Sequence, residues 1–320
     1  MSKTKDFLVI KSDKRTTATN RPYYRLLMRK EGGEEVTANI WEKNIAEEPK
    51  RGDIICAFYT EELYEGKTQL NIEKYSIRLD YPKDKFKQSP IVDQDKVFKK
   101  LYLNSWFNLD IDKLFKNLLQ YLQKENLIYS VKEAPAASRN HHNRRAGLLQ
   151  HMEEMWDFAE VICSRPPTGM LITDAYVSGP RHFEGLVDLE IVKAAILFHD
   201  LGKIKEYDLD TGESDQDREL AYMGHVSWGA IILAQCWPEG GNSELRNKLI
   251  HCVLSHHGRI EHAAALQPRI PEATVLHLVD LLSAQLDIHR TASKLPQGQR
   301  PEFSKTLFET TPITTSWPVK

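Results

Sequence analysis

An acidic side chain follows directly on an apolar segment in the second half of the chain. Residues 194–198 read AAILF, and His199 and Asp200 come next. An ionised carboxylate is costly to bury unless its charge is paired, and a metal ion is one of the few partners that makes burial tolerable. The segment therefore predicts a buried helix that ends at a metal centre.

Histidine separates the two halves of the chain, because all 12 histidines lie between His141 and His289. Each one alone fits a hydrogen-bonded core residue, which is the usual role of a histidine on an apolar face. Several histidines and two aspartates stand on, or at the end of, apolar helical segments: His151, His199, Asp200, His225, His256, His257 and Asp280. Imidazole and carboxylate donors without thiolates suit Mn²⁺, Fe²⁺, Mg²⁺, Ni²⁺, Co²⁺ or Zn²⁺ held between helices. The set as a whole predicts a metal site.

Length and composition describe an ordinary globular protein with room for two domains, since the chain has 320 residues and a domain usually has about 100–200. No apolar run approaches the roughly 18 residues of a membrane span, and the N-terminus lacks the apolar core of a signal peptide. The four cysteines are scattered, without a CxxC pair. We therefore expect a cytoplasmic protein with reduced thiols and no membrane contact.

Charge is distributed unevenly along the chain. Lys and Arg outnumber Asp and Glu in residues 1–30 and 96–150, whereas acidic residues predominate in 151–320. A basic front half suits a polyanionic partner, although charged faces are usually just solvated.

The first part of the chain has the pattern of short strands. Five segments are rich in β-branched and aromatic residues, and turn-like joints such as TATNRP, EGGE and YEGK separate them. The segments are FLVIK, YYRLLMRK, EVTANIWE, DIICAFYTEEL and TQLNIEKYSIRL. This spacing predicts a five-stranded barrel of the OB type over residues 1–80, followed by a linker at 81–95.

From about residue 96 the period of the apolar residues becomes helical. Leu114, Leu118 and Leu122 recur every four residues. Further helical patterns cover 148–163, 188–199, 225–237, 243–256 and 272–287. They predict an all-α domain at 96–290 with a C-terminal tail at 291–320, so that the chain is a multidomain α+β protein. The loops 164–185 and 207–220 are long enough to be lids or surface excursions.

Short blocks in the helical half carry a family resemblance. GLLQH, FHDLGK, GH, SHHG and VD follow one another in the order that resembles the HD-domain superfamily of metal-dependent phosphohydrolases. With RTTATNRPYYRL, EVTANIWE and YEGKTQLNI in the front barrel, the chain is similar to the YhaM-type 3′–5′ exoribonuclease family over residues 6–290. The match has departures, among them Gln150 in the GLLQH block and the long loop at 164–185.

The resemblance implies a set of roles at the metal centre. One ion would be held by His151, His199, Asp200 and Asp280. Asp200 would bridge to a second ion, which His225, His256 and His257 would complete. Asp200 and Lys203 would be the catalytic residues, with Lys203 facing the phosphate. Mn²⁺ is the first choice for the two divalent ions, and Mg²⁺, Fe²⁺, Co²⁺, Ni²⁺ and Zn²⁺ are alternatives.

A barrel of this type would capture single strands through basic and aromatic side chains. The candidates on the barrel are Arg15, Arg21, Tyr23, Arg25, Trp41, Tyr64 and Lys67, and those near the metals are Arg144, Arg145 and Lys203. The barrel core is an equal alternative for Trp41, and plain surface charge is an equal alternative for Arg144 and Arg145. His141 and His142 belong to the matching family block.

Three functions stay open at this stage. The preferred one is a metal-dependent 3′–5′ exoribonuclease on single-stranded RNA, with single-stranded DNA as a further substrate and a homo-oligomer as an option. The second is a phosphodiesterase or nucleotidase on small nucleotides. The third is a nucleic-acid-binding adaptor with a structural metal. No GYP signature follows His256-His257, and Leu-Gly-Lys replaces the acidic residues that alarmone hydrolases carry after HD.

Overall fold

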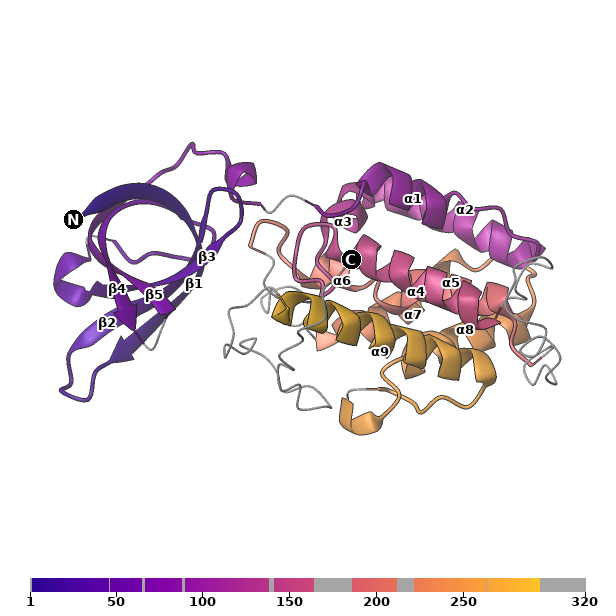
Figure 1. Cartoon of the computed structure of the whole chain (residues 1–320). Coiled ribbons are helices and arrows are strands. Elements are labelled where there is room, and N and C mark those ends of the chain that lie inside the picture. Colours follow the sequence, from indigo (N-terminus) through magenta and orange to yellow (C-terminus); the bar gives the residue numbers. More distant parts are fainter. Residues whose placement is uncertain are drawn as a thin grey trace, which may run out of the picture. The chain divides into compact units, whose positions relative to one another are not determined.

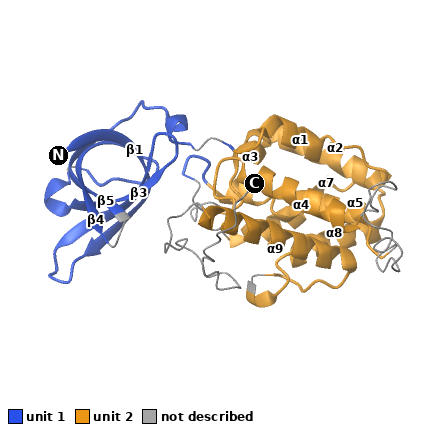
Figure 2. Ribbon diagram, in the orientation of Figure 1, with its two compact units in different colours: residues 1–90, 208–213 blue, residues 91–207, 214–320 orange. Residues whose placement is uncertain are grey.

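The structure is a computed structural model that divides the chain into two compact units. It describes residues 2–45, 47–64, 67–87, 90–137, 141–163, 186–211, 222–262 and 264–293, without the side chains of Lys67 and His262. Residues 1–90 and 208–213 make one unit, called the barrel unit, and residues 91–207 and 214–320 make the helical unit (Figures 1 and 2). Each unit is described by itself below.

The barrel unit contains a closed five-stranded barrel. Its strands are β1 (Lys3–Thr16), β2 (Pro22–Lys30), β3 (Glu35–Trp41), β4 (Ile54–Tyr64) and β5 (Lys67–Ile77). They close in the order β1-β2-β3-β5-β4, and all neighbours are antiparallel except β3 and β5. The 3₁₀ turn η1 (Glu42–Asn44) follows β3. The predicted OB-type barrel is therefore confirmed, together with the mixed α+β class.

Alternation along β2 and β3 separates the barrel core from its outer face. Tyr24, Leu26 and Met28 of β2 are buried inside. Tyr23 and Arg25 lie between them in sequence and are only partly buried. Because side chains of a strand point alternately to its two sides, these two lie on the outer face.

The segment predicted as a linker is partly a cover for the barrel. The 3₁₀ turn η2 (Lys83–Phe86) places Phe86, which is fully buried, against Leu8, Ile10 and Ile54. The reason lies in β1, where residues 7–10 are buried without alternation and the register shifts between Val9 and Lys11. A strand with two apolar faces needs a second covering layer, and residues 81–87 supply part of it.

The barrel unit also holds the beginning of the loop predicted at 207–220. Arg29 is almost buried and donates to the carbonyl oxygens of Asp210 and Thr211 at 3.3 and 2.9 Å. Arg51 donates to Thr211 Oγ1, and Lys87 pairs with Asp210. Residues 208–211 are thus fastened to the barrel, while 212–221 and the predicted loop 164–185 lie outside the described residues.

The helical unit is built around α5 (Leu189–His199), which packs against α4 (Gly147–Cys163), α7 (Gly224–Cys236), α8 (Ser243–Ser255) and α9 (Pro271–Ala292). These agree with the five later helices predicted from the sequence. The remaining elements are α1 (Gln94–Tyr102), α2 (Leu109–Lys124), α3 (Ile128–Glu133), α6 (Lys203–Glu206) and η4 (Ile260–His262). None of the described helices combines the length and apolarity that crossing a membrane requires.

The start of α5 is fixed by Asp188, whose side chain accepts hydrogen bonds from the backbone N–H groups of Glu190 and Ile191. Such an N-cap satisfies donors that the helix itself cannot pair. From there the apolar face of α5 is buried up to His199. The end of the helix, and with it Asp200, is therefore placed in the interior of the unit.

Replacing Phe86 with Ala tests the covering role of residues 81–87. Loss of a fully buried Phe side chain leaves a cavity and should lower the free energy of unfolding by about 3–5 kcal/mol. Urea unfolding followed by circular dichroism measures the change. Phe107→Ala is the matched control, because Phe107 is 96% exposed and its loss should leave the unfolding curve in place. Equal unfolding curves for the two variants would contradict the covering role of residues 81–87.

Candidate metal centre

Asp200 lies at the centre of the candidate site. It directly follows α5 and is 2% exposed. Its Oδ2 accepts from Lys203 Nζ at 2.6 Å and lies 3.2 Å from His199 Nε2. Its other oxygen, Oδ1, lies 3.4 Å from His225 Nε2 and 3.8 Å from His256 Nε2. The two oxygens of one carboxylate therefore serve different groups of neighbours.

The helices bring together two groups of three residues around this carboxylate. Within each group, every residue has one potential ligand atom that lies within 4.8 Å of those of the other two. The first group is His151, His199 and Asp200, and the second is His225, His256 and His257. Asp280 of α9 joins the first group, since its Oδ1 lies 3.1 Å from His151 Nε2. All seven residues predicted as metal ligands thus meet in one region.

A close approach of two backbones holds the second group near Asp200. Gly202 lies in the turn after Asp200, and a Cβ at this position would come within 2.3 Å of the carbonyl oxygen of His225. Any side chain there would push the start of α7 away. Glycine in the HDLG sequence is therefore needed for packing, because it lets His225 reach Asp200.

Several buried polar atoms of the site have no hydrogen-bond partner within the described residues. They are Asp200 Oδ1, the Nε2 atoms of His199, His225 and His256, and His257 Nδ1. His199 Nδ1 and His256 Nδ1 lie 2.7 Å from the carbonyl oxygens of Ile196 and Val253. A carbonyl oxygen only accepts, so in the neutral rings the hydrogen is on Nδ1 and the lone pair on Nε2.

These unpartnered atoms fit a divalent cation. Lone pairs of imidazole nitrogens that face a carboxylate oxygen repel one another unless a proton or a cation lies between them. A ring whose Nδ1–H is tied to a carbonyl or carboxylate, with Nε2 free, is the usual arrangement of a metal-binding histidine. His225 follows the same scheme, because its Nδ1 lies 2.8 Å from Glu206 Oε2.

The charges around Asp200 keep it ionised. Burial alone would raise the pKa of Asp200, but the Lys203 ammonium and the imidazoles of His199 and His225 outweigh it and lower that pKa well below its usual range. The pKa of Asp280 is lowered in the same way, since the hydrogen bond and charge of His151 outweigh burial. Burial likewise opposes the charge of Lys203, yet Asp200 and Tyr207 raise the pKa of Lys203. The site therefore combines two carboxylates with one fixed ammonium.

Glu206, Glu154 and Ser283 support the site but were not predicted from the sequence. Glu206 orients His225, and Ser283 Oγ lies 3.0 Å from His151 Nδ1 and donates to Glu154 Oε2 at 2.9 Å. The only signal that could have found them is helical spacing. Glu154 stands three residues after His151, Ser283 three after Asp280 and Glu206 three after Lys203, so that each pair shares a helix face.

Two arginines predicted to bind substrate have internal partners instead. Arg144 donates to both carboxylate oxygens of Asp287, at 3.1 and 2.6 Å, and to Gln150. Arg145 donates to both oxygens of Glu133, at 2.6 and 2.9 Å. Bidentate pairs of this kind direct the guanidinium plane into the protein. The structure thus gives Arg144 and Arg145 a role in holding the segment before α4, and their contact with RNA stays a prediction.

The predicted contacts on the barrel fall into two places. Tyr23 and Trp41 are register partners on β2 and β3, and their rings lie 5.5 Å apart on the outer face. Trp41 is therefore not in the barrel core. Arg15 pairs with Tyr23 in register, Arg25 follows on β2, and Arg21 is exposed just before that strand. Tyr64 is exposed at the end of β4, away from this pair in the strand order, and the side chain of Lys67 lies outside the described residues.

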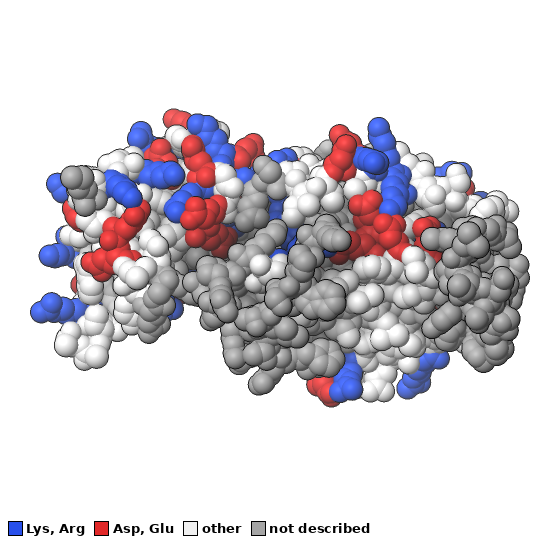
Figure 3. All heavy atoms as spheres, viewed as in Figure 1, with Lys and Arg blue, Asp and Glu red and all other residues white. Residues whose placement is uncertain are grey.

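Charge does not single out a binding face on the side of the barrel unit that Figure 3 shows. On the side of the barrel unit seen in Figure 3, positive and negative side chains are interspersed and form no continuous basic patch. The expectation of a basic front half holds for composition along the chain, and this face shows that acidic neighbours lie among the basic residues. The partly buried aromatic pair of Tyr23 and Trp41 on the outer face is the sharper signal.

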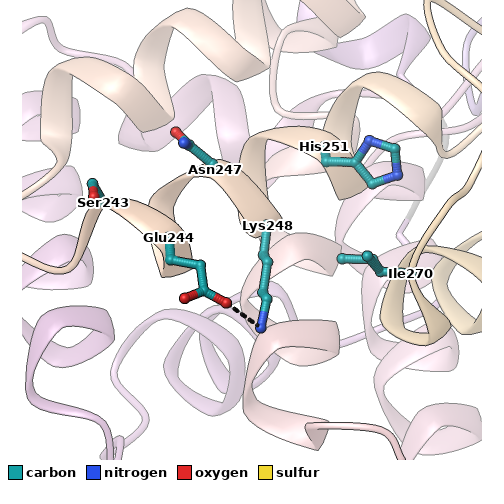
Figure 4. A pocket seen from close by; sticks show the side chains of 6 residues that line it. All are labelled: Ser243, Glu244, Asn247, Lys248, His251 and Ile270. Carbon is teal, nitrogen blue, oxygen red and sulfur yellow. Dashed lines mark ion pairs between the residues drawn. The ribbon is translucent and has the colours of Figure 1, made fainter.

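One open hollow lies along α8, away from the predicted site residues. Ser243, Glu244, Asn247, Lys248, His251 and Ile270 line it (Figure 4). Glu244 and Lys248 pair with each other, and His251 Nε2 accepts from the backbone N–H of Arg269. Its charged groups and its histidine are thus already engaged, and it is not a candidate for the chemistry.

Comparison with known proteins places this geometry in a family context. Residues 148–285 match the HD domain, a span that includes every predicted metal ligand. Over 94% of its length the chain is similar to proteins named 3′–5′ exoribonuclease YhaM, covering 90% of each: 28% identical to that of Oceanobacillus iheyensis, 26% to that of Bacillus subtilis and 28% to that of Bacillus pumilus. The resemblance expected from the sequence is confirmed, as is the expectation of a hydrolase acting on phosphodiester bonds.

Metal affinity should rise with pH, because a proton and a cation compete for His199 Nε2. Burial lowers the pKa of His199, but Asp200 outweighs it and the pKa is raised above its ordinary value of 6.5. Below that raised pKa a cation must displace the proton, so the affinity should fall by up to about tenfold per pH unit. Calorimetric titration of Mn²⁺ at about pH 6 and about pH 8, in buffers of different ionisation enthalpy, measures the affinity and the proton released. An affinity that is independent of pH would contradict this competition.

Proposed function

We propose that this chain, which carries an HD domain and resembles the YhaM-type enzymes along almost its whole length, is a metal-dependent 3′–5′ exoribonuclease acting on single-stranded RNA. The observation that carries the proposal is the convergence of buried, unpartnered lone pairs on the two oxygens of Asp200. Such a group of lone pairs suits divalent cations, because without a cation or a proton between them the lone pairs repel one another. The names of the relatives supply the substrate and the direction of digestion.

The residues that would hold two ions follow from the two groups described above. The first comprises His151, His199, Asp200 and Asp280, and the second Asp200, His225, His256 and His257. Bound divalent ions, with Mn²⁺ as the first choice, supply Lewis acidity and lower the pKa of a coordinated water. Asp200 would serve both ions, because its two oxygens face different groups. The neutral imidazoles would complete both sets of ligands without cancelling positive charge.

Lys203 gives the centre a fixed positive charge of its own. Its ammonium is held by Asp200 Oδ2 and is 7% exposed. An ammonium has three donors, and Asp200 takes one of them. In our proposal another donor faces a non-bridging phosphate oxygen, where it stabilises charge that grows during hydrolysis.

Capture of the strand is assigned to the outer face of the barrel. Tyr23 and Trp41 form an aromatic platform there, and Arg15, Arg21 and Arg25 stand on the same two strands or beside them. Base stacking tolerates any sequence and does not read the 2′-hydroxyl, so single-stranded DNA should bind to this face as well. We place this activity in the cytoplasm, in keeping with the unpaired cysteines.

Asp200→Ala should remove nuclease activity. The variant loses the carboxylate that faces both sets of ligands, and kcat should fall by at least about 10²–10³-fold. A 5′-labelled RNA oligomer incubated with Mn²⁺ measures this, and the wild-type protein should produce a ladder that shortens from the 3′ end. Asp157→Ala, an exposed site on α4, is the control and should retain activity. Hydrolysis of small nucleotides alone would favour a phosphodiesterase, and binding without cleavage an adaptor; either result would reject the nuclease.

Trp41→Ala should weaken RNA binding without changing the chemistry. Loss of one stacked base is worth about 1–3 kcal/mol, which raises the Kd for an oligomer by about 5- to 150-fold. Fluorescence anisotropy with labelled RNA measures Kd, and hydrolysis of a dinucleotide measures the intact centre. Trp41→Phe keeps an aromatic face and should recover most of the affinity. An unchanged Kd for Trp41→Ala would move the capture surface elsewhere.

A further inference from the structure

His141 and His142 lie in the segment that precedes α4. Neither belongs to the two groups of proposed metal ligands. We propose that His141 is a further ligand for a divalent cation at the metal centre, and that a hydrogen-bond relay from Glu154 through His142 sets its lone pair. The inference rests on the proposed function only in requiring that the centre bind divalent cations. The position of each hydrogen on these side chains decides which nitrogen atoms have lone pairs.

The backbone of His142 is held firmly, so the directions of the two rings are determined. His142 is fully buried and has a positive φ of 47°. Its N–H donates to Asp287 Oδ2, and its carbonyl oxygen accepts from the N–H groups of Ala136 and Arg144. Arg144 also donates a hydrogen bond to the side chain of Asp287. A residue in this strained region persists only where the surrounding contacts enforce it.

Glu154 is the acceptor at the start of the relay. Its Oε2 accepts from Ser283 Oγ and lies 3.1 Å from His142 Nε2, while Oε1 accepts from Gln150 and Arg290. Burial raises the pKa of Glu154, but His142 and the other donors outweigh it and lower it to about 2. The carboxylate is thus ionised and can only accept. The hydrogen between Glu154 and His142 is therefore on His142 Nε2.

The next two hydrogens follow from this one. A neutral His142 with its hydrogen on Nε2 has a lone pair on Nδ1. His141 Nδ1 lies 3.2 Å from that atom and must donate to it. The single hydrogen of a neutral His141 is then on Nδ1, and Nε2 presents a lone pair.

Glu154 also determines which nitrogen of His151 carries the hydrogen. Because the Ser283 hydroxyl donates to Glu154, Ser283 accepts from His151 Nδ1–H and leaves the lone pair of His151 on Nε2. The rings of His141 and His151 are 4.9 Å apart, and ligand atoms of His141, His142 and His151 lie within 4.8 Å of one another. One ionised Glu154 therefore prepares two neighbouring imidazoles as electron-pair donors.

The lone pair of His141 Nε2 fits a cation better than a phosphate. Among the neighbours of this ring, Asp280 of α9 brings a negative charge and Lys203 of α6 a positive one, while the His151 ring is neutral in this arrangement. A ring that offers a lone pair cannot donate a hydrogen bond to a phosphate oxygen, but it can bind a metal ion. If His142 were instead an imidazolium, the relay would reverse and His141 Nε2–H would face the phosphate.

Metal titration of His141 variants separates these two arrangements. Mn²⁺ binding to the metal-stripped full-length protein is measured by calorimetry for the wild type, His141→Ala and His141→Asp, with the exposed His289→Ala as matched control. His141→Ala should bind Mn²⁺ at least about tenfold more weakly, and His141→Asp, which keeps a donor atom, should recover much of that loss. His289→Ala should match the wild type. Equal metal-free unfolding temperatures show that the variants are folded.

Each of the following results would overturn the inference. Wild-type Mn²⁺ affinity in His141→Ala is the first, and with RNA cleavage intact it would leave the proposed function standing. The second is weaker RNA binding in His141→Asp than in His141→Ala at equal Mn²⁺ affinity, which would make His141 a phosphate donor. The third comes from nitrogen NMR of ¹⁵N-histidine-labelled metal-free protein, where a hydrogen on His141 Nε2 would reverse the relay. A wild-type protein that binds no Mn²⁺ would reject both this inference and the proposed centre.

Glu154→Gln tests the relay itself. The amide has one acceptor atom and two donors, so it cannot accept from both Ser283 and His142 as the carboxylate does. We expect the NMR signals of both His141 and His151 to change tautomer or broaden, and Mn²⁺ affinity to fall by about 10- to 100-fold. A change at His151 alone would contradict the branch to His141.

Discussion

The helical unit is organised around a carboxylate that is ionised in the protein interior. Asp200 is withdrawn from water at the end of α5, where an unpaired charge would be far too costly for a domain of ordinary stability. Lys203 neutralises one oxygen at 2.6 Å, and the other oxygen has no hydrogen-bond partner within the described residues. The helices that surround α5 are arranged so that imidazoles fill the space around this second oxygen. A cation there would complete the balance of charge.

The supporting residues matter because they decide which imidazole nitrogens have lone pairs. Carbonyl oxygens of the preceding helical turn fix His199 and His256, Glu206 fixes His225, and Ser283 with Glu154 fixes His151. Each of these partners accepts a hydrogen bond, so each ring turns an electron pair toward the centre. This common pattern of acceptors therefore marks the ring nitrogens that can bind a cation.

The elements of the fold could be predicted from the sequence because their signals are local. Alternation along β2 and the four-residue recurrence in α2 report on neighbours a few positions away. The prediction of a linker at 81–95 missed the burial of Phe86, since its partners Leu8, Ile10 and Ile54 are distant in sequence. The internal partners of Arg144 and Arg145 could not be predicted for the same reason. Their carboxylate partners, Asp287 and Glu133, are not marked by any spacing relative to them.

The sequence by itself determined the chemical inventory: imidazoles and carboxylates without thiolates, placed on apolar helices, behind a β-rich segment that contains aromatic residues. The tertiary structure alone decided which of them meet. His151 and Asp280 are 129 residues apart yet 3.1 Å from each other, and the backbone of His142 reaches Asp287 across 145 residues. Local sequence sets the conformation of each helix, whereas the packing of helix on helix sets the distances between side chains. Metal binding and hydrogen placement depend on those distances, and so they could be read only from the folded chain.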